Sequence, residues 1–140
     1  MASVKGTNFT NITADPVVKV DSGMWSGKMR VQYDSFEASS LASGSDISVA
    51  RLPKGAMVWD VVLMHDALGS GVTLKVGDSA DDDRYVAATA AASAGVISMH
   101  NDGAIAGFGF EQTAETDVLI TTGGAAATGT IKIKIVYAVE

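Results

Sequence analysis

The segment "GTIKIKIVYAVE" (129–140) decides the fold class that we predict for this chain. Every second residue from position 131 onward is apolar, and Lys132 and Lys134 stand between the first three of these apolar residues. The apolar positions are Ile131, Ile133, Ile135, Tyr137 and Val139. A period of two places the two sets of side chains on opposite sides of an extended chain. The segment therefore predicts a β-strand with one side buried and the other in water.

The residues before this strand predict its partner. "TDVLITT" (116–122) is a second run of strand-forming residues, and "GGAAATG" (123–129) is a flexible link between the two runs. Two such runs joined by a short glycine-containing segment indicate a C-terminal β-hairpin.

The same alternation recurs upstream. "KMRVQY" (28–33) puts Met29, Val31 and Tyr33 on one side of a predicted strand, and "VTLKVG" (72–77) alternates in the same way. Each of these runs therefore predicts a further half-buried strand.

A different pattern occupies "GAMVWDVVLMHDAL" (55–68). Apolar residues lie on both sides of this predicted strand, with Asp60 and His65 as the polar exceptions. A strand that is apolar on both sides lies between two layers or against a partner subunit.

Five weaker runs complete the strand count, and no helix of ten or more residues is predicted. They are residues 16–20, 46–52, 84–89, 95–100 and 107–112. About eight to ten short strands with regular turn signals indicate an antiparallel sandwich, jelly-roll or barrel. All three are all-β folds, and the strand pattern alone does not choose among them.

The N-terminal segment "MASVKGTNFTNITAD" (1–15) differs from the rest of the chain. It is polar, it precedes Pro16, and its apolar anchors are Val4, Phe9 and Ile12. We predict an extended N-terminal arm that either adds an edge strand or reaches a neighbouring molecule. Residues 16–140 then form a single sandwich domain, which is large enough to fold without disulfide bonds or structural metal ions.

Composition excludes several classes of function. The chain has no cysteine, which rules out disulfides, thiolate metal sites and a cysteine nucleophile, and which fits a cytoplasmic protein. Its ten basic residues are scattered singly against sixteen acidic ones, so no basic footprint for nucleic acid is present. The chain also lacks a signal-peptide pattern and a run of apolar residues long enough to span a membrane. We therefore expect a soluble, acidic domain (pI near 4.7) that binds neither nucleic acid nor membrane.

No catalytic pattern is present. The two histidines, His65 and His100, fall in different predicted strands and match neither a zinc-protease motif nor a Ser-His-Asp series. We interpret each as an ordinary strand or loop residue with one hydrogen-bond partner, and we predict no enzyme activity and no cofactor.

The acidic stretch "VGDSADDDRY" (76–85) is the one candidate for a cation site. Calcium loops need oxygen ligands at alternating offsets and a distal bidentate Glu, and here Arg84 follows instead. On an extended segment the three adjacent aspartates, Asp81 to Asp83, would point to alternate sides, so they could meet at one ion only in a special turn. We therefore predict a charged turn without a metal, in which Asp78 binds turn amides while Asp81 and Asp82 face water or a basic patch.

One block resembles a known family. "ISVARLPKGAMVWDVVLMHDALGSGVTLKVGDSADDDRYVAATAAASAG" (47–95) is similar to the head decoration, or cement, proteins of tailed bacteriophages. The elements that carry the resemblance are Leu52 to Ala56, Asp66 to Gly69, Thr73 to Asp78 and Asp83 to Tyr85. The resemblance implies a jelly-roll-like sandwich on the outer surface of the capsid, synthesised in the cytoplasm of the bacterial host. There it would bridge subunits of the major capsid protein, without catalytic residues and without a cofactor.

Composition also favours burial against partners. The chain is 47% hydrophobic, with a mean hydropathy of +0.23, more than a small monomer comfortably hides. The resemblance implies a homodimer, or alternatively a homotrimer, and we expect it to form through residues 55–65 or the C-terminal hairpin. The candidate partner-binding residues are Val4, Phe9, Ile12, Trp25, Met57 and Trp59.

Two other functions fit parts of the sequence. A carbohydrate-binding jelly-roll on a phage head fibre or tail would need Trp25 exposed beside polar loops. A small barrel enzyme of the cupin type would need histidine ligands grouped in space.

Overall fold

The structure is a computed structural model, and it describes residues 2–102 and 105–139. Met1, where the predicted arm begins, and Glu140, where the last predicted strand ends, lie outside the described residues.

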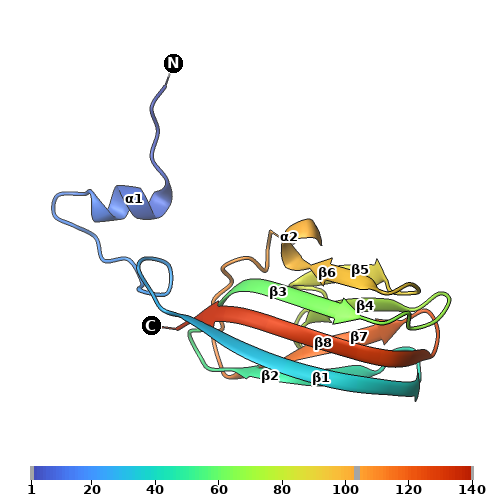
Figure 1. The fold of residues 1–140 in the computed structure, drawn as a ribbon. Helices are drawn as coiled ribbons and strands as arrows, with labels where there is room; N and C mark the ends of the chain where they lie inside the picture. Colours follow the sequence, from blue (N-terminus) through green and yellow to red (C-terminus); the bar gives the residue numbers. More distant parts are fainter. Residues whose placement is uncertain (1, 103–104, 140) are drawn as a thin grey trace.

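The described residues form two four-stranded antiparallel sheets that pack face to face (Figure 1). Sheet A has the strand order β1-β8-β3-β6, and sheet B has the order β2-β7-β4-β5. The strands are β1 (Met29–Leu41), β2 (Asp46–Leu52), β3 (Met57–His65), β4 (Thr73–Gly77), β5 (Val86–Ala90), β6 (Gly95–Ser98), β7 (Thr116–Gly123) and β8 (Ala127–Ala138). The helices are α1 (Thr7–Ile12) and α2 (Met99–Asp102). The predicted all-β sandwich is confirmed.

The strand order is that of a jelly roll. The first strand pairs with the last, the second with the seventh, the third with the sixth, and the fourth with the fifth. This is the pattern of one long hairpin folded over on itself. Each sheet therefore combines segments that are far apart in the sequence.

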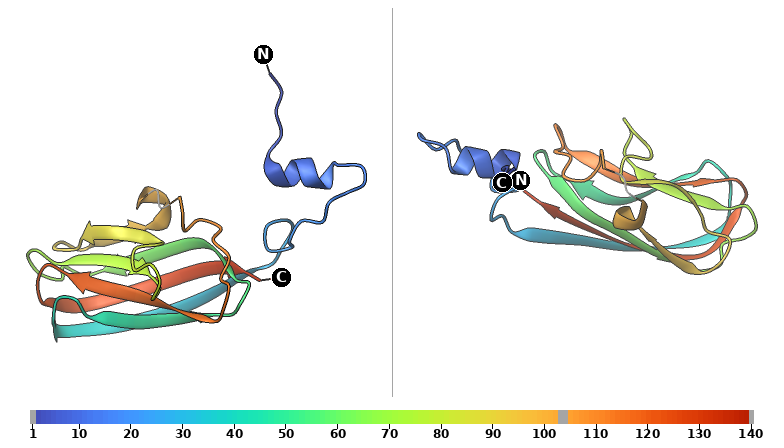
Figure 2. Two further views of the ribbon diagram at one scale, coloured as in Figure 1. Left: turned by 180° about the vertical axis from the view of Figure 1, so that it is seen from behind. Right: turned by 90° about the horizontal axis from the view of Figure 1, so that it is seen from above.

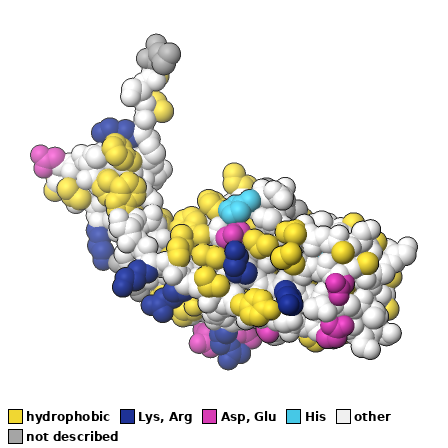
Figure 3. Space-filling model, viewed as in Figure 1, with side chains coloured by type: hydrophobic (Ala, Val, Ile, Leu, Met, Phe, Trp, Pro, Cys, Tyr) yellow, Lys and Arg dark blue, Asp and Glu magenta, His cyan; other side chains and the backbone are white. Residues whose placement is uncertain are grey.

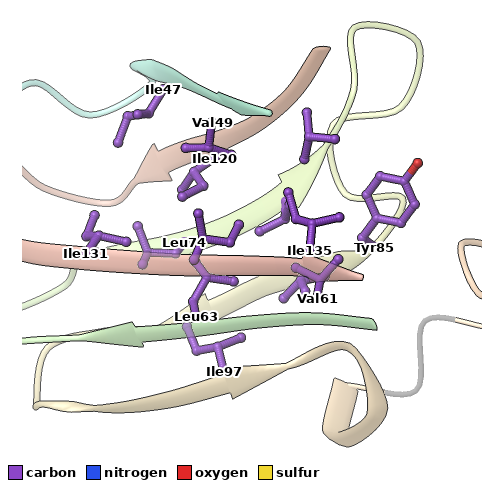
Figure 4. Packing of buried hydrophobic residues seen from close by; sticks show 14 of the residues in the cluster. Ile47, Val49, Val61, Leu63, Leu74, Tyr85, Ile97, Ile120, Ile131 and Ile135 are labelled. Carbon is purple, nitrogen blue, oxygen red and sulfur yellow. The ribbon is translucent and has the colours of Figure 1, made fainter. Parts of the chain in front are cut away.

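The core lies between the sheets, and β8 supplies its centre (Figure 4). Ile131, Ile133 and Ile135 are at most 2% exposed, as the alternation in this segment predicted. They lie opposite Leu74 and Ile120 of sheet B. Burying an aliphatic side chain of this size contributes about 1.5–3 kcal/mol, so this one strand supplies a large part of the driving force.

The strand that is apolar on both sides lies in the interior of sheet A. β3 pairs with β8 on one edge and with β6 on the other. Val61 and Leu63 point into the core and are fully buried, whereas Met64 points outward and is 60% exposed. A bulge between Val58 and Asp60 changes the alternation there, so that Val58 is buried as well.

The first half of β1 faces the opposite way from what its pattern suggests. Val31 and Tyr33 point to solvent, and the polar Gln32 lies on the inner side. The Gln32 amide donates to the Arg51 carbonyl at 2.7 Å and accepts from the Arg51 amide at 3.0 Å. It thereby closes the edge of β2 as a strand would, and this link between the sheets explains why the polar side turns inward.

Two predicted strands are absent. Residues 16–20 are irregular, and residues 107–112 form turns with a single bridge between Glu111 and Met57. Gly109 has φ +77°, which interrupts an extended chain at that point. The predicted strand 95–100 ends at Ser98, after which α2 begins.

The segment before β1 extends away from one end of the sandwich (Figures 1 and 2). Residues 7–12 of the predicted arm form α1, which buries none of its residues. The hydroxyls of Thr10 and Thr13 donate to the carbonyls of Gly6 and Phe9, so local hydrogen bonds support the turn of helix. Neither helix among the described residues could cross a membrane. The division of the chain at residue 15 stays a prediction.

Candidate functional site

The outer side of sheet A presents an apolar surface, which we call the sheet A face. Paired residues of antiparallel strands lie on the same side of a sheet, so the register defines its members. Its central members are Val31, Tyr33 and Ser35 of β1, Lys132, Lys134 and Val136 of β8, Asp60, Val62 and Met64 of β3, and Val96 and Ser98 of β6. Six of these eleven residues are apolar.

The apolar members are exposed to an unusual degree. Tyr33 is 63% exposed, Met64 60%, Val31 59% and Val96 55%. They belong to β1, β3 and β6, and the space-filling view shows hydrophobic side chains on this side of the sandwich with basic side chains between them (Figure 3). A contiguous apolar surface of this kind on a small domain marks an interaction site.

The centre of the sheet A face is basic. Lys132 and Lys134 are exposed in adjacent rows, and neither forms an ion pair with any residue that the structure describes. Asp60 is the one carboxylate among these eleven residues, and its side chain is 23% exposed; Glu37, in the next register pair of β1 and β8, adds a second carboxylate at the end of the face. Its Oδ1 lies 3.1 Å from His100 Nε2, an ion-pair distance without hydrogen-bond alignment. The face therefore combines apolar side chains with two lysines that pair with no carboxylate in the described part of the chain.

An aromatic cluster borders the sheet A face beside Asp60. The rings of Trp59 and Phe108 pack edge to face with centroids 5.3 Å apart, and His100 lies 5.8 Å from Phe108. A Cβ at Gly109 would stand 3.0 Å from the Trp59 ring, so glycine permits this close packing. The Trp59 Nε1 atom is buried and has no hydrogen-bond partner among the described residues. Trp59 thus acts mainly as an apolar surface.

The six predicted partner-binding residues fall into two groups. Four precede β1: Val4 (87% exposed), Phe9 (47%), Trp25 (42%) and the half-buried Ile12. The other two are on β3, where Met57 is fully buried and Trp59 is half-buried. Met57 lies against the turn at Gly23, so its side chain contacts the protein's own chain and not the surface. Partner binding by the four residues that precede β1, and by Trp59, stays a prediction.

Sequence reasoning named none of the sheet A face residues as candidates. The signal that was present is the strand 55–68, whose two apolar sides indicated either a second layer or a partner. Its outward residues Val62 and Met64 are on this face. The contribution of β1 depends on its register with β8, which the sequence does not contain.

The outer side of sheet B, which we call the sheet B face, is polar. Its members are Asp46, Ser48 and Arg51 of β2, Asp117, Leu119 and Thr121 of β7, and Thr73 and Lys75 of β4. Its cations are paired. Arg51 Nε lies 2.6 Å from Asp117 Oδ1, and Lys75 Nζ lies 2.6 Å from Asp82 Oδ2. The hydrogen bond from Arg51 holds the pKa of Asp117 below its usual value.

The acidic stretch 76–85 is a turn built around Asp78, as predicted. Asp78 is 2% exposed, and its Oδ1 accepts from the amides of Ala80 and Asp81, each at 3.0 Å. Arg84 Nε donates to its Oδ2 at 2.7 Å, and the guanidinium stacks on Phe110 at 3.8 Å from the ring centroid. Burial would raise the pKa of Asp78, but Arg84 and the two amides outweigh it and lower the pKa. The buried pair organises the turn.

The carboxylates of Asp81, Asp82 and Asp83 lie within 4.8 Å of one another, because the predicted turn brings them together. A hydrogen bond with Asp81 raises the pKa of Asp83, and Asp82 pairs with Lys75. These contacts account for the cluster within the protein, and we assign no metal to it.

The histidines have separate partners. His65 Nδ1 lies 2.8 Å from the Asp66 carbonyl, whereas His100 approaches Asp60. Within the described ranges no histidine joins two further potential metal ligands. The arrangement that a cupin-type site requires is therefore missing from these residues.

Comparisons with known proteins agree with the fold. No family model and no curated protein matches the chain. A chain of the capsid asymmetric unit of cyanophage Pam1 is 26% identical, with a TM-score of 0.66, over 81% of this chain and 86% of that one. A chain from the capsid of Ralstonia phage GP4 is 20% identical, with a TM-score of 0.66, over 81% and 86%. One from the acidic stable capsid structure of Helicobacter pylori bacteriophage KHP30 is 14% identical, with a TM-score of 0.60, over 81% and 90%.

These similarities define the class of fold. The two chains below 25% identity share the fold alone, and the Pam1 chain shares more of the sequence. The protein has a jelly-roll sandwich like those of chains in solved phage capsids.

Proposed function

We propose that this protein is a non-enzymatic structural component of a bacteriophage particle, a cement or decoration protein. It binds the outer surface of the head, bridges neighbouring major capsid protein subunits and reinforces the shell against internal pressure. It is synthesised in the bacterial host cytoplasm and requires neither a cofactor nor nucleic acid.

One observation carries the proposal, namely the likeness over most of both chains to a chain of the Pam1 capsid asymmetric unit. The block 47–95 supports it independently, since its motif order resembles that of cement proteins. A protein of this kind needs adhesive surface and no active site. The exposed apolar sheet A face and the exposed apolar residues of the N-terminal segment supply such surface.

The segment before β1 is suited to bridging. It extends from the end of the sandwich (Figure 1). Its helix α1 buries no residue, and Phe9 on it is 47% exposed. We propose that this segment contacts a neighbouring subunit. Deleting residues 2–12 should weaken attachment to heads and change the thermal unfolding midpoint little. A large fall in the midpoint would show that the segment belongs to the core.

We further propose that the protein self-associates as a homodimer, with a homotrimer as the alternative. β3 and β8 are paired on both edges, so their edges cannot receive a second copy. The long edge strand β1 has a free edge and is the better route, because unpaired edge groups readily pair with another chain. Sedimentation velocity of the purified chain measures the state directly, and a monomer at all concentrations would contradict the proposal.

The decisive test is reconstitution on phage heads. Purified protein is mixed with heads of the parent phage assembled without this chain, and occupancy is measured by electron cryo-microscopy. We expect stoichiometric, symmetry-related density on the outer surface and greater resistance of the heads to heat. Absence of binding to heads would refute the cement function.

A second candidate is carbohydrate binding by a head-fibre or tail module. The observation that favours it is Trp25, which is 42% exposed in the polar turn 21–27. Trp25 makes no ring contact with another described aromatic residue, so the stacking platform would consist of one ring. A glycan-array signal that Trp25→Ala abolishes would establish this function in place of the first.

A further inference from the structure

We propose that the sheet A face is the surface on which the protein sits on the capsid, and that it receives an apolar patch carrying carboxylates. The inference rests on the proposed function and deepens it by assigning the contact surface and the chemistry of the partner. It also fixes the orientation of the molecule, with sheet B facing outward.

The first argument is exposure. Four apolar side chains of the sheet A face, Val31, Tyr33, Met64 and Val96, are each more than half exposed, although the adjacent core is well packed. At about 25 cal/mol per Å² of apolar surface removed from water, covering them is favourable. The sheet B face has the same strand architecture but exposes charged and hydroxyl side chains instead. Removing water from the sheet A face is therefore more favourable in free energy than removing it from the sheet B face.

The second argument is charge. Lys132 and Lys134 stand in the middle of the apolar surface without an intramolecular carboxylate partner among the described residues. Covering an unpaired ammonium group with an apolar surface alone would be costly. The occupant must therefore bring carboxylates to these two positions. A two-fold dimer centred on β8 would set four lysines against one another, which disfavours a second copy of this chain.

The third argument is area. Four strands about 4.8 Å apart, over about eight residues of 3.3 Å each, give a face of roughly 20 by 25 Å, on the order of 500 Å². A stable two-body interface buries about 800 Å² per partner. One sheet A face is therefore too small for tight binding alone. It suits a repeating shell, where linked weak contacts add up through avidity.

Charge reversal tests the assignment. The double variant Lys132→Glu/Lys134→Glu changes two exposed residues of the sheet A face. Its matched control, Arg51→Glu/Lys75→Glu, makes the same change in net charge on the sheet B face. Both are compared with the full-length wild-type chain for binding to heads assembled without it, by co-sedimentation at low and high NaCl. We expect at least a tenfold loss of affinity for the sheet A variant and less than a threefold change for the control.

A second pair of variants tests the apolar part. Tyr33→Ser/Met64→Ser removes two exposed side chains of the sheet A face, and Ser48→Ala/Thr121→Ser alters the sheet B face as its control. Thermal unfolding establishes that each variant folds. We expect the first variant to lose at least tenfold in affinity at both salt concentrations, because apolar burial is not screened. The part of the affinity for heads that depends on Lys132 and Lys134 should instead decrease as the NaCl concentration rises.

The outcomes separate the inference from the proposed function. If wild-type protein binds heads and the sheet A variants bind equally well, the assignment of the face is overturned and the cement function stands. If wild-type protein binds no heads, both the cement function and the assignment of the sheet A face are refuted. If the wild-type chain alone forms a dimer that the sheet A variants abolish, a second copy occupies the face and the assignment is overturned.

Discussion

The two outer faces of the sandwich belong to sheets of the same size that share one core, yet they differ in chemistry. The sheet A face exposes Tyr33 and Met64 and leaves its two lysines unpaired among the described residues. On the sheet B face Arg51 and Lys75 both have carboxylate partners. The cations of the sheet B face are therefore paired in the free protein, whereas the sheet A face exposes apolar side chains and two lysines that are available to a partner. The difference points to the sheet A face as the binding side.

The largest expected effect separates the inside of sheet A from its outside. Leu63 and Met64 are neighbours on β3, with exposures of 0% and 60%. Leu63→Ala should destabilise the fold by about 2–5 kcal/mol, because it leaves a cavity in the core. Met64→Ala should change the free energy of unfolding by less than about 0.5 kcal/mol. Urea unfolding measures both, and an equal cost would show that the sheet A face is already covered within the monomer.

The next effect separates a buried ion pair from an exposed one on the sheet B side. Asp78→Asn leaves Arg84, which is 13% exposed, without its carboxylate, and should cost about 3 kcal/mol. Asp82→Asn removes a carboxylate that is 56% exposed and should change stability little. Chemical denaturation of the two variants gives the comparison. Equal losses would contradict the buried, organising role of Asp78.

Lowering the pH should show how much the ion-paired carboxylates on the sheet B side contribute to stability. Asp78 and Asp117, both on the sheet B side, have pKa values held below the usual 3.8. A carboxylate with a lowered folded-state pKa stabilises the protein fully above its unfolded pKa. That stability is lost as the pH falls from about 3.8 through the folded pKa. We expect unfolding free energy to fall steeply below about pH 4 and to fall less steeply in Asp78→Asn. Identical slopes would show that Asp78 does not carry the effect.

The smallest expected effect concerns self-association. Lys132→Ser/Lys134→Ser removes the charge repulsion between two sheet A faces. The control Lys75→Ser removes a lysine of the sheet B face that is already paired with Asp82. The first variant should associate at lower protein concentration than wild type, with a nearly unchanged unfolding midpoint. Sedimentation velocity over a concentration series detects the shift. Association of the Lys75 variant to the same degree would remove the distinction between the faces.

Sequence patterns predicted the elements whose signal is local. The last strand was found from its alternating isoleucines, and residues 46–52 were placed on β2 with its observed bounds. Local sequence patterns were insufficient where contacts between distant residues decide the structure. Residues 16–20 are apolar enough for a strand but have no partner strand in the described part of the chain. A turn was predicted at Asp81 to Asp83, but whether their carboxylates meet depends on its shape, which the contact between Arg84 and Asp78 helps to set.

The candidate surface was found only in part. The sequence identified the apolar excess and the strand with two apolar sides, and both pointed to a partner. It pointed to Met57 as well, which the turn around Gly23 covers. Whether a neighbouring segment covers a side chain depends on the path of the chain, and no local pattern records that path.

The sequence by itself determined that the chain forms short antiparallel strands, that Ile131, Ile133 and Ile135 face the core, and that Lys132 and Lys134 face away from it. Strand periodicity is a property of consecutive residues, so it can be read without a structure. The tertiary structure decided that β1 pairs with β8 and therefore turns Val31 and Tyr33 outward beside those lysines. Register joins residues about a hundred positions apart, and only the folded sheets specify it.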